Sequence, residues 1–444
     1  MILPGHRAAR GLAAAALIAF CAPPPAASAA THGTFDWGAR LRLRQEYLAN
    51  VYDFSEATED DHNCIRVRPQ IWGSWAPGEH WKLYAMLTNE HRHWLKSNKG
   101  LEDRDFEIHE LIFENLWVEG KRLGGTPFGF VLGRQNLFYG DGFVCWDGGP
   151  LDGSRTAYFN ALVLKAEFEK RRVEAHFISN PEHDEYLPVA NDQDQRLVEW
   201  KETGAGLYYV DESAGKRKVE AYYFYKNEKR TDGAFPESDI HTIGARASGK
   251  APASLSYAVE GAVQLGGRGP DDRLGYGGQA TLRRELPSWT PSGGGIYLSG
   301  DDQSSEGYEG WNPVYSRWPK WSELYIYSLA GENGPAYWQN IASGWLGADI
   351  SPGGRLALEM RVLFLWAPEA RCEGCDPHST ALPSHVSGDF AYRGTLSTVK
   401  LVWNANPRVG GHLLWEMFEP GDYYEYSGGR NAAHFLRWEL LLAY

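Results

Sequence analysis

Hydrophobic and polar residues alternate with a period of two along most of the chain. Apolar side chains occupy nearly every second position in residues 35–43, 65–71, 255–265, 356–366 and 436–444, with polar or charged side chains between them. A repeat of 180° per residue is typical of a β-strand that has one apolar and one polar face. The pattern therefore predicts an all-β protein.

The polar face distinguishes two kinds of all-β protein. In a soluble sandwich or propeller it meets bulk water and is typically rich in Thr, Ser, Lys and Gln. Here it is rich in arginine opposed by Asp and Glu, and no fixed-period propeller repeat is present. Aromatic residues also stand near the predicted strand ends, at Trp37, Tyr47, Trp75, Trp81, Trp366, Trp438 and Tyr444. Paired charges inside and aromatic borders outside predict a transmembrane antiparallel β-barrel.

The connections between predicted strands differ in length. Short turns such as residues 76–79 and 351–354 alternate with long acidic loops at 52–63, 180–199 and 367–390. Short turns on one side and long loops on the other are typical of outer-membrane barrels. We expect 16 to 18 strands and favour 18. The last predicted strand ends in an aromatic residue, as closing strands of bacterial barrels do.

Residues 1–29 have the features of a secretory signal peptide. Arg7 and Arg10 precede an apolar stretch at 11–20, and Ala27-Ser28-Ala29 matches the A-x-A cleavage pattern. We expect removal of residues 1–29, leaving residues 30–444 as a single barrel domain. The expected location is the outer membrane of a Gram-negative cell.

The net charge of the chain limits the kinds of molecule that it is expected to bind. The chain has 44 Lys and Arg against 57 Asp and Glu, a formal net charge of −13. This acidic total disfavours nucleic-acid binding and argues mildly against a pore for anions. Much of the acid lies in predicted loops, for example at Asp60, Asp61, Glu182 and Asp184, where it would face the exterior.

Arginine on the polar face is the main candidate for function. Its planar guanidinium stays charged and suits carboxylates, and rings of charge set the selectivity of pores. The alternative is structural: the arginines pair with Glu46, Glu260, Glu359 or Glu439 and brace the barrel. The candidate pore-lining residues are Arg40, Arg42, Arg44, Arg66, Arg68, Arg134, Asp141, Asp152, Arg155, Arg246, Glu260, Arg283, Glu359, Arg361, Arg437 and Glu439.

Several motifs resemble those of the alginate export family of outer-membrane barrels. They are residues 133–142 (GRQNLFYGDG), 150–156 (PLDGSRT), 299–302 (SGDD), 311–313 (WNP), and Glu416 with 420–424 (PGDYY). The resemblance extends over residues 35–444 and implies an 18-stranded monomeric barrel whose arginine-lined pore passes an acidic polysaccharide. Residues 372–375 (CEGC) and 316–321 (SRWPKW) depart from the family pattern, which places the substrate in question more than the fold.

The glycine-rich segment 140–155 matches neither a phosphate loop nor a dinucleotide fingerprint. It contains Asp141 and Asp152, and it either folds into the lumen as a constriction or forms a solvated surface loop.

The cysteines give weaker signals. We predict a local disulfide between Cys372 and Cys375, because exported chains oxidise thiols and no second C-x-x-C completes a zinc site. Whether Cys64 and Cys145 pair is left open. Asp301 and Asp302 are a weak candidate for Ca²⁺ at a loop tip, and no other cofactor is expected.

The sequence carries no G-x-S-x-G or H-E-x-x-H signature, so an enzyme is not expected. We expect a channel for alginate-like, uronate-bearing polysaccharide or oligosaccharide. Its partners would be outer-membrane lipids, the anionic glycan and periplasmic export proteins. The alternatives are a general or small-nutrient diffusion porin and a surface adhesin.

Overall fold

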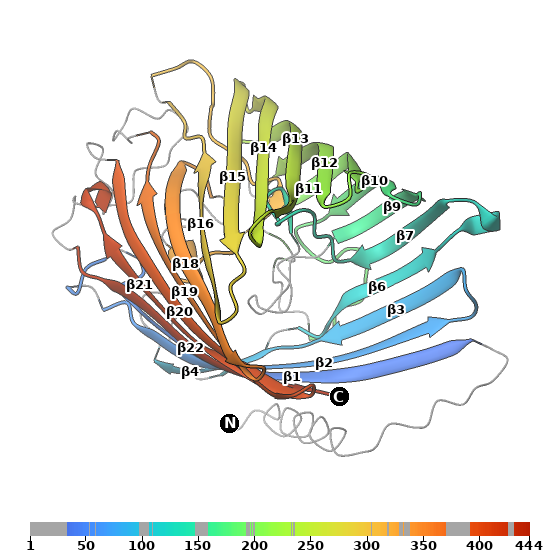
Figure 1. Ribbon diagram of the computed structural model, residues 1–444, viewed down its shortest axis with the longest axis horizontal. Helices are drawn as coiled ribbons and strands as arrows, with labels where there is room; N and C mark the ends of the chain where they lie inside the picture. The colour runs from blue at the N-terminus through green and yellow to red at the C-terminus, as the bar shows by residue number, and fades with distance from the viewer. Residues whose placement is uncertain are drawn as a thin grey trace.

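A ring of antiparallel strands makes up the molecule (Figure 1). The computed structural model describes residues 33–444 except 53, 58, 97–105, 109, 147–158, 192–195, 197, 199, 232, 234–235, 303, 318, 328–331, 333–337, 370–390 and 425–429. The predicted signal peptide, Asp152, Arg155, Cys372 and Cys375 lie outside the described residues. Within the described part, no helix combines the length and the apolar character needed to cross a bilayer.

The first half of the ring begins near the N-terminus. Its strands and single-turn helix are β1 (Thr34–Ala49), β2 (His62–Ala76), β3 (Trp81–Thr88), β4 (His91–Lys96), β5 (Phe106–Ile108), β6 (Ile112–Gly120), η1 (Leu123–Gly125), β7 (Phe128–Gln135), β8 (Cys145–Trp146), β9 (Phe159–Glu167), β10 (Arg171–Asn180), β11 (Lys201–Asp211) and β12 (Arg217–Lys229).

The second half returns to the starting point. Its elements are β13 (Ser238–Ala251), β14 (Leu255–Arg268), β15 (Asp271–Arg284), β16 (Trp289–Leu298), β17 (Tyr315–Ser316), β18 (Ile341–Gly353), β19 (Leu356–Trp366), β20 (Tyr392–Asn406), β21 (Val409–Pro420), η3 (Asp422–Tyr424) and β22 (Ala433–Ala443).

The sheet closes on itself between the first and last strands. β1 pairs with β2 on one side and with β22 on the other, in register Leu43↔Leu440. β3 and β4 both pair with β2, and β5 pairs with β4 as β6 does with β3. β3 and β4 therefore occupy one position in the barrel wall, and β5 and β6 occupy the next. The 20 strands of the sheet thus form one closed barrel with 18 strand positions. The prediction of an antiparallel barrel with 18 strands is confirmed.

The period-two pattern determines which side chains face out. Large apolar side chains such as Leu207 (54 % exposed) and Ile243 (58 % exposed) stand on the outer face. Their sequence neighbours on the other face, among them Tyr208 and Thr242, are buried inside the barrel. A closed ring satisfies every backbone group between strands, so the outer face can be apolar without an open edge.

The two ends of the barrel differ as predicted. The start of β1, the end of β22 and the short turns lie at one end, for example residues 77–80, 252–254 and 407–408. The long connections between β1 and β2, β7 and β9, β10 and β11, and β16 and β18 begin and end at the other end. In an outer-membrane barrel the short turns are periplasmic and the long loops extracellular.

Two of the long connections fold back into the barrel. β8 and β17 form a small parallel sheet, with Tyr315 paired to Cys145, and the rings of Phe143 and Trp311 stack 5.1 Å apart. These residues are at most 1 % exposed, apart from Trp146, and belong to the main apolar core, which therefore sits inside the barrel. The described part of segment 140–155, residues 140–146, thus lies in the lumen.

Candidate functional site

Strand register places the first group of predicted arginines side by side. Arg42 faces Arg68 and Arg44 faces Arg66 across β1 and β2, while Arg44 faces Glu439 across β1 and β22. Like charges directly opposite one another destabilise a sheet unless counter-charges lie between them. The register therefore places four arginines of β1 and β2 next to one another, and this arrangement needs carboxylates to be stable.

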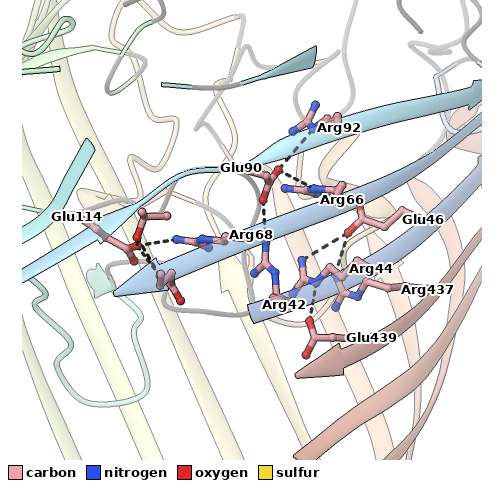
Figure 2. A network of polar contacts seen from close by, with 12 residues as sticks. Arg42, Arg44, Glu46, Arg66, Arg68, Glu90, Arg92, Glu114, Arg437 and Glu439 are labelled. Carbon is pink, nitrogen blue, oxygen red and sulfur yellow. Dashed lines mark hydrogen bonds and ion pairs between the residues drawn. The ribbon is translucent and has the colours of Figure 1, made fainter. Parts of the chain in front are cut away.

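Carboxylates from three other parts of the barrel supply that charge (Figure 2). Glu90, in the break between β3 and β4, accepts from Arg42 at 3.0 Å and from Arg66 at 2.9 Å. Glu114 of β6 accepts from Arg68 at 2.9 Å. Glu46 accepts from Arg66 at 2.8 Å, and Glu439 from Arg44 at 2.6 Å. Arg437 completes the group, 3.0 Å from Glu323 in the infolded segment 299–340.

This group, which we call the β1–β2 ionic network, is closed to solvent. Arg42, Arg44, Arg66, Arg68 and Arg437 are each 6 % exposed or less. Buried ion pairs of this kind hold strands in position, because losing one partner leaves an uncompensated charge. The geometry corresponds to the bracing role that the sequence left open as the alternative. Arg40, nearer the short-turn end, is only partly buried.

Arg134 of β7 anchors a long loop. Its guanidinium donates two hydrogen bonds to the carboxylate of Asp184, at 2.6 and 2.7 Å, and a third to Asn160 at 2.9 Å. A side chain at Gly133, where φ is +125°, would overlap the carbonyl oxygen of Leu116 on β6. The GRQ motif thus allows close strand packing and ties loop 181–200 to the wall.

A second group of predicted residues lines a cavity of about 420 Å³ on the opposite wall. We call it the lumen pocket. Asp141 reaches it from the infolded segment, Arg246 from β13, Arg283 from β15 and Arg361 from β19. Glu260 of β14 lies beside it, 3.7 Å from Arg246. The structure therefore brings together five candidates that are up to 220 residues apart in sequence.

The cations of the lumen pocket differ in their pairing. Arg246 is buried and donates to Glu220 at 2.5 Å and to Asp141 at 2.9 Å. Arg283 pairs with Asp349 of β18, but its side chain remains 41 % exposed. The guanidinium of Arg361 lies 5.5 Å from the ring centre of Trp345, and no ion pair to Arg361 occurs among the described residues. Arg361 thus differs from Arg246 and Arg283, each of which is bound to a carboxylate.

The lumen pocket also contains one cation and two tryptophans that were not among the sequence candidates: Lys320, Trp321 and Trp345. The ammonium of Lys320 lies 5.2 Å from the ring centre of Phe138 and 5.9 Å from that of Trp146. Desolvation by the surrounding protein lowers the pKa of Lys320 from its ordinary 10.5, although Asp141 and Glu260 oppose this shift. Lys320 and Trp321 belong to the basic and aromatic stretch 316–321, which departs from the family pattern. That departure was the sequence signal that could have indicated them as residues of the site.

The remaining candidates lie apart from both groups. Glu359 is 3.7 Å from Lys400 of β20. Asp301 and Asp302 bond within their own loop, where Asp301 accepts from the backbone of Glu309 and Asp302 from Ser304. The described residues contain no cluster of three His, Cys, Asp or Glu side chains suited to a metal ion, and the Ca²⁺ site stays a prediction. Cys64 is a buried thiol on β2, and Cys145 is buried on β8.

Solved outer-membrane barrels of Pseudomonas aeruginosa share this architecture. OccK3 (OpdO) is 11 % identical, with a TM-score of 0.56 over 92 % of this chain and 96 % of that one. OccD3 (OpdP) is 10 % identical, with a TM-score of 0.56 over 95 % of both chains. OpdK, solved with vanillate, is 12 % identical, with a TM-score of 0.55 over 92 % of this chain and 98 % of its own. These likenesses establish the fold.

No curated protein matches the chain. Residues 34–434, however, match the family described as Alginate export. That range includes all the strands that close the barrel up to the start of β22. With the closed 18-strand barrel, the match identifies an outer-membrane channel of a Gram-negative cell. The chain belongs to the Alginate export family.

Proposed function

We propose that this channel passes anionic, uronate-bearing saccharides along the wall formed by β13 to β19. The observation that carries the proposal is the lumen pocket, where Arg283, Arg361 and Lys320 surround a cavity of about 420 Å³. The opposite wall is unsuited to this task, since its arginines are buried in ion pairs. Permeant anions would therefore follow the side of the lumen where cations remain exposed.

The chemistry of the lumen pocket suits a carboxylated sugar. The guanidinium of Arg361 and the ammonium of Lys320 can each bind a carboxylate, and the planar faces of Trp321 and Trp345 can pack against a pyranose ring. Ser248, Ser256 and Thr281 add hydroxyl groups for the sugar hydroxyls. Each contact would be weak, as conduction requires, because a permeant species must leave as readily as it binds.

A second candidate is a diffusion channel for small carboxylates. The infolded segments fill part of the lumen with apolar core, which narrows the route left for a polymer. The barrels of similar fold include one solved with vanillate, a small aromatic carboxylate. Both candidates require anion binding at the same cations and differ in the size of the permeant molecule.

The test is conductance of the purified barrel in planar bilayers. Under a salt gradient, the reversal potential of the wild type should show anion preference, and uronate oligomers should block the current. Arg361→Gln combined with Arg283→Gln should reduce both effects. Arg284→Gln is the matched control, since Arg284 is exposed and follows Arg283 on β15 with its side chain on the outer face.

The outcomes separate the candidates. Block by uronate oligomers that depends on Arg283 and Arg361 supports the saccharide channel. Permeation of monomeric carboxylates without oligomer block favours the small-molecule porin. A double variant that folds and keeps wild-type selectivity and block would show that the lumen pocket does not line the route.

A further inference from the structure

A second and larger hollow lies at the short-turn end of the barrel. Its volume is about 680 Å³, within the range of about 300–1,000 Å³ that small-molecule sites occupy. It is formed by the turns at 354–355 and 405–409 together with the ends of β20, β21 and β22. We call it the periplasmic hollow, since the short turns of an outer-membrane barrel are periplasmic.

The side chains of the periplasmic hollow face the lumen. In β20 the outer face carries Leu401, which is 38 % exposed, so its neighbours Lys400 and Val402 point inward. In β21 the buried His412 pairs with Val402, and in β22 Glu439 pairs with His412. Lys400, Val402, His412 and Glu439 therefore connect the hollow to the channel interior.

Positive charge predominates in the periplasmic hollow. Arg355, Lys400 and Arg408 contribute three cations, and Glu439 is the only acidic residue in the lining. The carboxylate of Glu439 is already bound by Arg44 at 2.6 Å and lies 3.4 Å from His412. Arg355 and Arg408 are exposed, and neither has an ion pair among the described residues. The guanidinium of Arg408 lies 5.5 Å from the ring centre of Tyr444.

Uncharged hydrogen-bonding groups accompany these cations. The amides of Asn404 and Asn406 line the same hollow and are exposed to it. Asn406 Oδ1 accepts from the backbone of Arg408 at 2.8 Å, which leaves its amide nitrogen free to donate. Guanidinium groups for carboxylates beside amides for hydroxyls form a lining that suits a carboxylated sugar better than a simple inorganic anion.

A track of charge connects the periplasmic hollow to the lumen pocket. Lys400 of the hollow pairs in register with Glu359 of β19. Arg361, which lines the lumen pocket, follows on the same face of β19. An offset of two residues and one strand spacing place the backbones of Lys400 and Arg361 roughly 8 Å apart, so a carboxylate released at Lys400 has the next cation on the neighbouring strand.

We propose that the periplasmic hollow is a docking subsite for a short stretch of carboxylated saccharide, with Arg355, Arg408 and Lys400 binding its carboxylates. This inference rests on the proposed function and adds a second site at the periplasmic mouth of the channel. It predicts that the two mouths of the channel differ in their affinity for uronate oligomers. An oligomer that arrives from the periplasmic side meets a binding site before it reaches the part of the lumen narrowed by the infolded segments.

The experiment measures block of single channels by a uronate trimer added to one chamber at a time. In the wild type, the association rate of block should be higher from one side. Arg355→Gln with Arg408→Gln should lower the rate from that side roughly tenfold, because removal of two exposed cations weakens the electrostatic attraction that steers the anion into the hollow. The rate from the other side should stay within error of the wild type.

The control variant removes the same amount of charge from the same end of the barrel as the test variant. Arg217→Gln with Arg284→Gln removes two exposed arginines near the short-turn end that lie outside the hollow. This control should leave both rates unchanged, as should replacement of the uronate trimer by a neutral trimer. Inorganic phosphate should compete only weakly, because it cannot use the amides and the cations together. Folding is checked by gel migration and open-channel conductance.

The possible failures are distinct. If block is equal from both chambers and Arg355→Gln with Arg408→Gln changes neither rate, the periplasmic hollow is not a subsite, while the lumen pocket stands. If the control variant lowers the association rate of block as much as the test variant does, the rate depends on the total charge at the short-turn end. That result would refute the subsite. If the wild type is blocked from neither side, the proposed function itself fails.

Discussion

At Arg68 and Arg361 the same side chain meets different surroundings. Arg68 is 1 % exposed and donates to Glu114 at 2.9 Å, beside Gln70. Arg361 is partly exposed, lies against the face of Trp345 and has no ion pair among the described residues. A guanidinium that is already bound to a buried carboxylate has few hydrogen-bond donors left for a ligand. One that packs against an aromatic face keeps its N–H donors for a ligand.

Arg68 provides a test of the bracing role. Arg68→Met should destabilise the barrel by roughly 3–5 kcal/mol, because the buried carboxylate of Glu114 would lose the cation that lies 2.9 Å from it. Adding Glu114→Gln should recover much of the loss. The measurement is the urea midpoint at which the heat-modifiable gel band disappears. Equal midpoints for wild type and Arg68→Met would contradict the assignment.

The same reasoning applies to the charge reversal Arg42→Glu with Arg68→Glu. It would place two new carboxylates beside Glu90 and Glu114. We expect this variant to fold poorly, so it cannot report on selectivity. Selectivity is better tested at Arg283 and Arg361.

Lys320 should make anion selectivity depend on pH. Because its pKa is lowered by desolvation, the ammonium loses its proton at a lower pH than an ordinary lysine, whose value is 10.5. Anion preference should therefore fall as the pH rises, and the fall should come at a lower pH than the loss of charge from an ordinary lysine. Reversal potentials at increasing pH measure this. Lys320→Arg should abolish the alkaline step, and a step that persists in that variant would assign it to another group.

At the scale of elements, the infolded segment 299–340 is held to the wall by β20 and β21. The carboxylate of Glu416 accepts from Ser322 Oγ at 2.9 Å and from the backbone of Glu323 and Leu324 at 2.9 and 2.8 Å. Arg393, fully buried, donates to Glu332 at 2.7 Å and to Tyr424 at 3.1 Å. These contacts keep the segment inside the barrel, where it narrows the lumen.

Loosening this attachment should widen the channel. Arg393→Met removes the cation that pairs with the buried Glu332, so the segment should leave the wall part of the time. The expected result is a higher and noisier single-channel conductance with an unchanged gel shift. Tyr392→Phe, at the neighbouring position of β20, is the control. A folded Arg393→Met channel with wild-type conductance would show that the segment does not limit the current.

At the scale of the whole molecule, charges are sorted by location. The chain is acidic, with a formal net charge of −13, yet the lumen pocket and the periplasmic hollow both carry an excess of cations. Net charge therefore does not report the sign of the pore. The barrel separates the two populations, since lumenal residues come from alternate strand positions and many acids from the loops.

This arrangement predicts a dependence of selectivity on salt. The Debye length falls from about 10 Å at 0.1 M to about 3 Å at 1 M, so pocket cations act over a shorter range in concentrated salt. Anion preference, measured as reversal potential under the same concentration ratio, should decrease as the mean concentration rises. A preference independent of salt would mean that selectivity depends on direct contact alone.

The sequence by itself determined the class of fold and the sidedness of its strands. Alternation is local: each strand residue points opposite to its neighbour, so runs such as 35–43 and 436–444 indicate an apolar outer face and an inward arginine face. Turn lengths then predicted the two ends, and the family motifs predicted 18 strands. The closed barrel confirms these expectations because hydrogen bonding between neighbouring strands follows chain order almost everywhere.

Only the tertiary structure decided which charged side chains are bound in buried ion pairs and which line a cavity. Arg44 meets Glu439 across 395 positions of sequence, and Arg68 meets Glu114 across 46. Lys320 reaches the lumen pocket from a loop whose path depends on the core around Trp311 and Tyr315. Alternation specifies only the face of a strand. Pairing depends on strand tilt, on breaks such as the one at Glu90, and on what folds back into the barrel, and these arise only when the ring closes.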